Sequence, residues 1–142
     1  MAVSKRIVVD SNFFIGLFNP VDTNHKRAVD LAKKLEAQQS RLVLSTFIFL
    51  ETVTVLAQRR GKSVAREVGT LLRTDPFVTI MVVDEVLNDT TWRIFHNVED
   101  KNISFVDCSI ITLMQAENIS TLLTFDTDFN KLHALHPFTF FE

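Results

Sequence analysis

The chain has 142 residues, 46% of them hydrophobic, and a formal net charge of −2. This size and composition predict one domain covering residues 1–142, and no Gly-, Pro- or Ser-rich stretch indicates a linker or a disordered tail. The slight negative charge excludes a protein that is held on nucleic acid by its overall charge alone.

Cys108 is the only cysteine. An intrachain disulfide and a zinc site built from several cysteines are therefore excluded, which fits a reducing compartment. No apolar run reaches the ~20 residues that a membrane-spanning helix needs. We therefore expect a cytoplasmic protein that does not contact a membrane.

Short β-branched runs alternate with stretches of helical periodicity along the whole chain. In chain order, the pattern predicts a strand at 6–10, a short helix at 13–18, a helix at 22–38, a strand at 41–45, a helix that Thr46 caps and that ends at Gly61, a helix at 64–72, a strand at 78–83, a helix at 86–98, a nearly all-apolar helix at 106–117, and strands at 121–125 and 138–141. This alternation indicates the α/β class, with a mostly parallel central sheet of four to five strands flanked by helices.

Four acidic residues are expected at one edge of this sheet. Asp10 and Asp126 each follow a buried strand, and ligands of parallel sheets bind at the carboxyl ends of the strands. Glu51 lies in the early turns of the helix after the second strand, and Asp107 opens the helix that leads to the strand before Asp126. We therefore expect the four carboxylates to converge from four separate segments.

These carboxylates lie in strongly apolar sequence, where uncompensated charges are costly to bury. No Lys, Arg or His lies within three residues of Glu51, Asp107 or Asp126, so a bound cation is the expected compensation. Hard oxygen ligands favour one or two Mg²⁺ or Mn²⁺ ions over zinc. The plainer interpretation of any one acid is a helix cap or a solvated turn residue, and Asp107 fits that interpretation best.

Four segments together carry a family resemblance over nearly the full chain. They are Val-Val-Asp10-Ser-Asn12, Phe-Leu-Glu51-Thr-Val, Ser104-Phe-Val-Asp107-Cys-Ser-Ile-Ile and Leu-Leu-Thr124-Phe-Asp126-Thr-Asp128-Phe. In this order and spacing, the chain resembles the PIN-domain ribonucleases, particularly VapC-type toxins of toxin–antitoxin pairs. The resemblance implies a PIN-like fold, Mg²⁺- or Mn²⁺-dependent RNA cleavage in the cytoplasm, a protein antitoxin and a homodimer, for which Phe13, Phe14 and Phe18 are a candidate surface.

The resemblance also implies roles for single residues. The catalytic acids are Asp10, Glu51, Asp107 and Asp126. Asp10 and Asp107 would hold the first cation, Asp126 would share it or hold a second, and Asp128 matches a position that sometimes provides an outer ligand. Glu51 would orient the attacking water or act as the base. The side chains of Asn12, Ser104 and Thr124 are suited to hydrogen bonds that orient the carboxylates.

A basic stretch follows the helix that carries Glu51. It comprises Arg59, Arg60, Lys62 and Arg66 and contains no acid. It is a candidate site for RNA phosphates, although cations also gather at helix ends because of the helix dipole.

Two other functions are compatible with acids at strand ends. The first is a metal-dependent phosphatase or a receiver-like phosphoacceptor, which usually adds a late lysine. Lys131 is the only late lysine, and its position in a polar turn rather than at the end of a strand weakens this alternative. The second is a catalytically silent PIN-like module that holds a structural cation and binds RNA or a protein. A zinc site at His133 and His136 has little support, because no carboxylate motif accompanies them.

Overall fold

The computed structural model describes residues 4–142 of the chain. Within this range, no helix has the length and apolar character that crossing a membrane requires. The elements are β1 (Arg6–Val9), α1 (Ser11–Phe18), α2 (His25–Ala37), β2 (Arg41–Ser45), α3 (Thr46–Arg60), α4 (Lys62–Thr74), β3 (Val78–Met81), α5 (Glu85–Asn97), α6 (Phe105–Glu117), β4 (Thr121–Leu123), the 3₁₀ helix η1 (Thr127–Leu132) and β5 (Thr139–Phe140).

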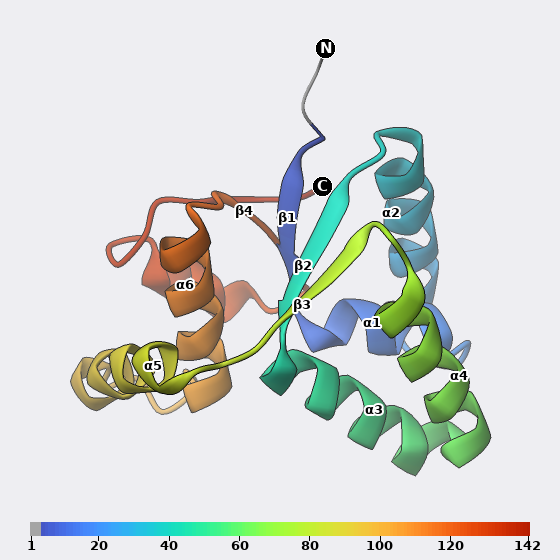
Figure 1. Ribbon diagram of the computed structural model, residues 1–142, viewed down its shortest axis with the longest axis horizontal. Coiled ribbons are helices and arrows are strands. Elements are labelled where there is room, and N and C mark those ends of the chain that lie inside the picture. Colours follow the sequence, from blue (N-terminus) through green and yellow to red (C-terminus); the bar gives the residue numbers. More distant parts are fainter. Residues whose placement is uncertain (1–3) are drawn as a thin grey trace.

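The five strands form one sheet in the order β3-β2-β1-β4-β5, and every neighbouring pair is parallel. The α/β fold with a parallel sheet that the sequence predicted is therefore confirmed. Helices α1, α2 and α4 lie on one side of the sheet, α5 and α6 on the other, and α3 extends from its lower end (Figure 1). Because both faces are covered, the central strands are apolar at nearly every position, as in Ile7–Val9 of β1.

The strand at 78–83 is shorter than predicted and lies at the edge of the sheet. β3 ends at Met81, which pairs with Ser45, the last residue of β2. Beyond that point the partner strand has become a helix, so Val83 N–H donates to Thr46 Oγ1 at 3.2 Å instead of to a strand. Val82 is consequently 69% exposed.

Helix α3 is capped one residue earlier than predicted. Ser45 Oγ accepts a hydrogen bond from Ile48 N–H at 3.3 Å, and Thr46 is already helical. β2 therefore passes into α3 without a loop, which fixes the direction of α3 at the end of the sheet. Helix α2 begins at His25 rather than at residue 22, because Asp22 Oδ1 accepts from Asn24 N–H at 2.8 Å in a turn.

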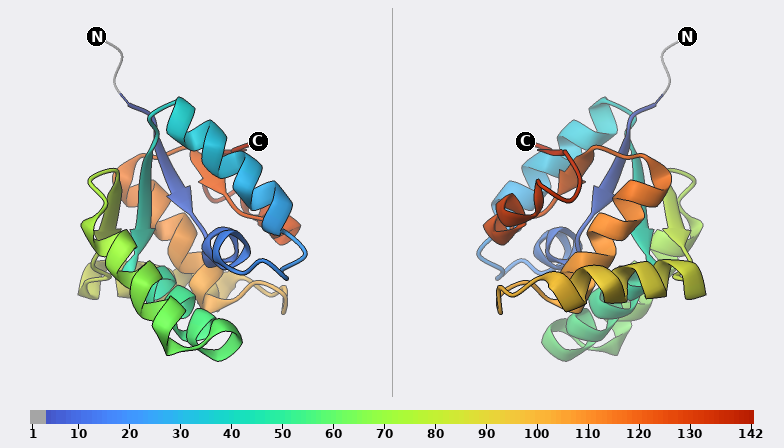
Figure 2. Two further views of the ribbon diagram at one scale, coloured as in Figure 1. Left: turned by 90° about the vertical axis from the view of Figure 1, so that its right-hand side faces the viewer. Right: turned by 90° about the vertical axis from the view of Figure 1, so that its left-hand side faces the viewer.

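Helix α6 is buried on nearly all sides, as its sequence predicted. It packs between the sheet and α5, which crosses its outer side (Figure 2). Cys108 is fully buried in it, and burial raises the pKa of its thiol to about 11. The thiol is thus a packing group that stays protonated at neutral pH.

Candidate active site

A pocket of about 710 Å³ lies where the strands end and α1, α3 and α6 begin. Four carboxylates line it: Asp10 after β1, Glu51 in α3, Asp107 in α6 and Asp126 after β4. Within residues 4–142, no Lys, Arg or His belongs to the lining. The structure thus brings together the four acids that the sequence singled out, from four segments far apart in the chain.

Asp10 is the most deeply placed of the four acids. It is 6% exposed and caps α1, with Oδ1 accepting from Ser11 N–H at 2.7 Å and Oδ2 accepting from Thr124 Oγ–H at 2.8 Å. Burial raises its pKa to about 7, and the charges of Asp107 and Glu51 add to the rise, while the two hydrogen bonds oppose it. Asp10 therefore gives up its proton at a higher pH than an ordinary aspartate when no cation is present.

Thr124 and Asn12 connect Asp10 to the segment after β4. Thr124 Oγ1 accepts from Asn12 Nδ2 at 3.2 Å and from Asp126 N–H at 3.1 Å while it donates to Asp10. Asn12 Oδ1 accepts from Phe125 N–H at 3.1 Å. These contacts hold the Asp10 carboxylate and the backbone of Asp126 in a fixed relation across the β1–β4 pair.

Asp107 is both a helix-capping residue and a pocket residue. It forms a capping box with Ser104, in which Asp107 N–H donates to Ser104 Oγ at 3.0 Å and Ser104 N–H donates to Asp107 Oδ2 at 2.9 Å. Partial burial raises its pKa, helped by the charges of Asp126 and Asp128 and opposed by hydrogen bonding with the backbone and side chain of Ser104. Asp107 thus caps α6, as the plainer interpretation of the sequence predicted, and its carboxylate also lines the pocket.

Asp126 and Asp128 differ in their surroundings. Asp126 Oδ1 caps η1 by accepting from Asp128 N–H at 2.9 Å, and Asp126 lines the pocket. Asp128 is not among the lining residues, and its Oδ1 lies 3.0 Å from Lys131 Nζ, which also pairs with Asp100 at 2.7 Å. Asp128 thus has an ion-pair partner of its own, and its role as an outer metal ligand stays a prediction. Because Lys131 is engaged away from the pocket, it also does not occupy the place of a phosphoacceptor lysine.

The pocket residues fit a divalent cation in the chemistry of their side chains, but their carboxylates are not grouped tightly around one point in the part of the chain that the structure describes. Among residues 4–142, no three His, Cys, Asp or Glu side chains lie close enough together to hold an ion between them. Like charges repel, and no basic side chain of the described range lines the pocket to offset them. Carboxylate oxygens are the ligands that Mg²⁺ and Mn²⁺ prefer.

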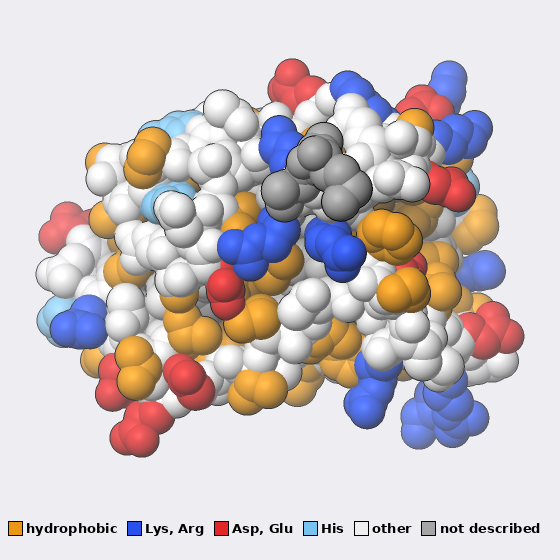
Figure 3. All heavy atoms as spheres, turned by 45° about the horizontal axis from the view of Figure 1, so that its top comes forward, with side chains coloured by type: hydrophobic (Ala, Val, Ile, Leu, Met, Phe, Trp, Pro, Cys, Tyr) orange, Lys and Arg blue, Asp and Glu red, His pale blue; other side chains and the backbone are white. Residues whose placement is uncertain are grey.

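The basic stretch lies apart from the acids. Arg59 and Arg60 end α3, Lys62 and Arg66 lie in α4, and none of them lines the acidic pocket. Eight residues of helix separate Glu51 from Arg59, about 12 Å along the axis, and Arg59 pairs with Asp22 at 3.7 Å. On the face shown in Figure 3, basic side chains lie in separate groups with acidic side chains between them, so this face offers no continuous basic surface. A role for the stretch in RNA binding stays a prediction.

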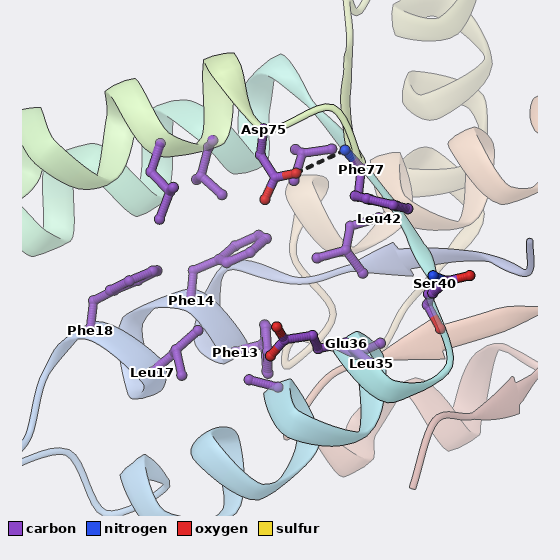
Figure 4. A pocket seen from close by; sticks show the side chains of 15 residues that line it. Phe13, Phe14, Leu17, Phe18, Leu35, Glu36, Ser40, Leu42, Asp75 and Phe77 are labelled. Carbon is purple, nitrogen blue, oxygen red and sulfur yellow. Dashed lines mark hydrogen bonds between the residues drawn. The ribbon is translucent and has the colours of Figure 1, made fainter.

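A second, mainly apolar pocket of about 440 Å³ lies between α1, α2 and α4 (Figure 4). Phe13, Phe14 and Phe18 line it, and the first two are 1% and 2% exposed. The prediction that Phe13 and Phe14 lie on an outer surface for a homodimer is therefore wrong, because α1 turns their side chains toward the core, whereas Phe18 is only half-buried and its place at such a surface stays a prediction. None of the four pocket acids lines this hollow, and Ser40 Oγ is buried there without a hydrogen-bond partner among the described residues.

Comparison with known proteins identifies the family. A family model described as PIN domain matches residues 7–135. The chain belongs to the PIN-domain family. A curated relative of this PIN-domain protein, the 23S rRNA-specific endonuclease VapC20 of Mycobacterium tuberculosis, is 29% identical over 125 residues, which make up 87% of this chain and 92% of the relative.

Solved structures give the same fold. The crystal structure of Mycobacterium tuberculosis VapC20, described as a sarcin-ricin loop cleaving toxin, is similar with a TM-score of 0.77 at 27% identity, covering 88% of this chain and 93% of that one. VapBC2 from Rickettsia felis bound to a promoter DNA fragment has a TM-score of 0.67 at 16% identity, covering 96% and 99%. FitAcB from Neisseria gonorrhoeae has a TM-score of 0.66 at 18% identity, covering 96% of each chain. The last two likenesses concern the fold alone.

Sequence reasoning missed the apolar part of the pocket. The pocket is lined by Phe47, Leu50 and Phe105 together with the four acids. Helical spacing contained the signal, because Phe47 lies one turn before Glu51 and Phe105 lies in the same first turn as Asp107. The hydrophobic pattern of the sequence instead predicts that most of the phenylalanines lie in the core.

Proposed function

We propose that this PIN-domain protein is a metal-dependent endoribonuclease and the toxin of a toxin–antitoxin pair. The observation that carries the proposal is the convergence of four carboxylates on one pocket whose described lining contains no basic residue. Such a pocket repels a phosphodiester unless a cation lies between them. The similarity to an rRNA endonuclease over 87% of the chain supports RNA as the substrate.

Asp10, Asp107 and Asp126 are the residues that would hold Mg²⁺ or Mn²⁺. The bound ion would supply positive charge that offsets the phosphate and makes a nearby water easier to deprotonate. Asp10 is oriented for this task by Thr124, and Asp107 by its capping box with Ser104. Glu51 lines the pocket on the α3 side, where its carboxylate would accept a proton from the attacking water.

An antitoxin would inhibit the enzyme by binding in the same pocket. An antitoxin segment with an arginine would neutralise the carboxylates through charge-assisted, bidentate hydrogen bonds, and would thereby exclude both the cation and RNA. The absence of Lys, Arg and His from the described lining supports this idea, because no resident cation competes with such an arginine. The homodimer that the family resemblance implies stays a prediction.

The test is RNA cleavage by the purified protein. Total RNA is incubated with the protein and Mn²⁺, with and without EDTA, and the cut ends are mapped. We expect discrete cuts that EDTA abolishes and that Glu51→Gln reduces by orders of magnitude. Glu67→Gln, at an exposed position of α4, is the matched control and should cleave like the wild type. If no divalent ion supports cleavage while metal and RNA still bind, the protein is instead a catalytically silent binding module.

A growth assay tests the toxin role separately. Expression of the wild type from a tightly controlled promoter should arrest growth, whereas expression of Glu51→Gln at the same level should not. Unimpaired growth with soluble, cleavage-competent protein would contradict the toxin role and leave the nuclease activity standing.

A further inference from the structure

Lys131 joins two segments that each carry a carboxylate of the pocket. It lies in η1, shortly after Asp126, and its Nζ lies 2.7 Å from Asp100 Oδ2 and 3.0 Å from Asp128 Oδ1. Asp100 belongs to the turn between α5 and α6, which leads into the first turn of α6. The ammonium group therefore bridges the segment after β4 and the segment before α6.

On the η1 side, the backbone around Lys131 is fixed in two ways. Asp126 Oδ1 caps η1 by accepting from Asp128 N–H at 2.9 Å. Phe129 and Leu132, before and after Lys131, are both buried in the hydrophobic core. The side chain of Lys131 thus starts from a segment whose position depends on Asp126, one of the four acids of the pocket.

On the α6 side, Asp100 organises the turn that leads to Asp107. Its Oδ1 accepts from Asn102 N–H at 2.9 Å, and its backbone carbonyl accepts from Ile103 N–H at 3.1 Å. The next residue, Ser104, is the N-cap of α6 and forms the capping box with Asp107. The contacts of Lys131 are thereby transmitted to a second acid of the pocket.

The pocket end of α6 needs such a connection. Along the chain, α6 is joined to β4 only at its far end, about 20 Å from its first turn. Asp107 and Asp126 line one pocket, and their like charges repel. Within residues 4–142, the two ion pairs that do not involve Lys131 lie elsewhere, at β1 and at the end of α3. Lys131 is thus the ion-pair contact that opposes this repulsion.

We propose that Lys131 is a positioning residue for the metal site, and that it holds Asp107 and Asp126 at the spacing that a divalent cation requires by tying Asp100 to η1. This inference rests on the proposed function. Lys131 does not line the pocket, so it leaves the place of the cation free. Without this link, the cation would have to bring the two carboxylates together as it binds, and its affinity would fall by that cost.

Replacing Lys131 by methionine gives a test in which the sign of the effect is informative. If charge alone acts, Lys131→Met should bind Mn²⁺ more tightly than the wild type, because a positive charge near the pocket is removed. If positioning acts, it should bind Mn²⁺ more weakly. We expect a dissociation constant raised by roughly 2- to 5-fold, the range for one partly exposed ion pair. Electron paramagnetic resonance of unbound Mn²⁺, with metal-free protein and without RNA, measures it.

Asp100→Asn breaks the same link from the other side and changes the charge in the opposite direction. Charge alone predicts opposite effects for Lys131→Met and Asp100→Asn, and nearly wild-type binding for the double variant. Positioning predicts weaker Mn²⁺ binding in both single variants. It also predicts that the double variant binds no more weakly than the weaker single variant, because either change breaks the link. Lys131→Arg keeps the charge and the donors, and should bind Mn²⁺ like the wild type.

Lys101→Met is the matched control. Lys101 is exposed in the same turn, carries the same charge and forms no ion pair within residues 4–142. This variant should bind Mn²⁺ at least as tightly as the wild type. Single-turnover cleavage gives a second measurement, in which Lys131→Met should change the Mn²⁺ concentration for half-maximal rate more than the rate at saturating Mn²⁺. Thermal melts in EDTA establish that the variants are folded.

The possible outcomes separate the inference from the proposed function. If the wild type binds Mn²⁺ and cleaves RNA, but Lys131→Met binds the ion as tightly as Lys101→Met does, the inference is overturned and the proposed function stands. If Lys131→Met binds Mn²⁺ more tightly and Asp100→Asn more weakly, charge alone explains both, and the inference is again overturned. If the wild type neither binds a divalent ion nor cleaves RNA, the proposed function fails and the inference fails with it.

Discussion

The hydroxyl of Thr124 donates a hydrogen bond of 2.8 Å to Oδ2 of Asp10, across 114 positions of sequence. A hydrogen bond to the charged form of a carboxyl group lowers its pKa, and this one opposes the rise that burial causes. Asp10 must be deprotonated to hold a cation. If Asp10 holds the proposed cation, Thr124 would therefore help to set the pH at which the cation binds.

Replacing Thr124 by valine should weaken metal binding most strongly at low pH. The variant keeps the shape of the side chain and removes the donor, so the pKa of Asp10 should rise above its present value of about 7. The Mn²⁺ concentration for half-maximal cleavage should increase at pH 6 to 7, and the difference from the wild type should shrink as the pH rises. Thr124→Ser keeps the hydroxyl and should restore the wild-type profile. An equal reduction at every pH would indicate simple disruption of the buried network instead.

The metal-free protein should lose stability as the pH rises toward neutrality, because of Asp10. Its folded pKa of about 7 lies above the ordinary value of 3.8, so the folded state binds more protons than the unfolded state between these values. The free energy of unfolding must then fall as the pH increases through that window, by an amount on the order of a few kcal/mol at most. The comparison of wild type with Asp10→Asn in EDTA, by denaturant unfolding at pH 4.5, 6 and 8, isolates this contribution. We expect the free energy of unfolding of Asp10→Asn to increase relative to that of the wild type as the pH rises. With Mn²⁺ in place of EDTA, the wild type should be the more stable of the two. A stability difference independent of pH would contradict the assignment.

The convergence of the four acids could be predicted from sequence because it follows from local rules. Asp10 and Asp126 follow buried strands, and parallel strands present such residues at the same edge of the sheet. Asn12, Ser104 and Thr124 could be predicted as orienting residues because each lies within three positions of an acid and carries a group able to hydrogen-bond.

Features that depend on distant partners could not be predicted in this way. Asp128 follows Asp126 closely in sequence, yet it pairs with Lys131, which also pairs with Asp100 31 positions away from Lys131, and it does not line the pocket. The early end of β3 depends on where its neighbour β2 passes into α3. The ring of Phe105 in α6 packs against Phe47 of α3 and Trp92 of α5, and periodicity within one helix gives no information on such contacts.

The basic stretch makes a separate prediction about longer RNA. Arg60 and Lys62 are exposed at the junction of α3 and α4, whereas Arg59 is paired with Asp22. Replacing Arg60 and Lys62 by glutamine should reduce the slope of log affinity against log salt by about 0.7 for each phosphate of single-stranded RNA that the variant no longer neutralises. Metal binding should not change, because neither residue lines the pocket.

Filter binding from about 50 to about 300 mM salt gives the slope. A matched double variant of exposed α2 residues, Lys26→Gln with Lys33→Gln, controls for the change in net charge. Identical slopes for the two double variants would assign Arg60 and Lys62 to the solvated helix end.

Asp107→Asn should stabilise the metal-free protein and lower its activity. The carboxylate lines a pocket with three other acids and, within residues 4–142, no basic residue, and partial burial already raises its pKa. Two unit charges ~4 Å apart at an effective dielectric of ~20 interact by about 4 kcal/mol, and solvent relaxation leaves less. Asparagine removes the charge, keeps nearly the same shape, and still offers an oxygen to Ser104 N–H in the capping box. In EDTA the variant should therefore be more stable than the wild type, by on the order of 1 kcal/mol.

With Mn²⁺ the order should reverse, because a ligand that binds only the folded state stabilises it more strongly the tighter it binds, and the variant lacks one of the proposed ligands. RNA cleavage should fall by orders of magnitude. Asp84→Asn is the matched control, since Asp84 caps α5 by accepting from Leu87 N–H at 2.9 Å and does not line the pocket. It should change neither the Mn²⁺ response nor cleavage. Thermal melts of the three proteins in EDTA and in Mn²⁺, alongside the cleavage assay, decide between the two roles of Asp107. Wild-type cleavage and an undiminished Mn²⁺ shift in Asp107→Asn would mean that Asp107 serves only as a cap and that the four-carboxylate site is wrong.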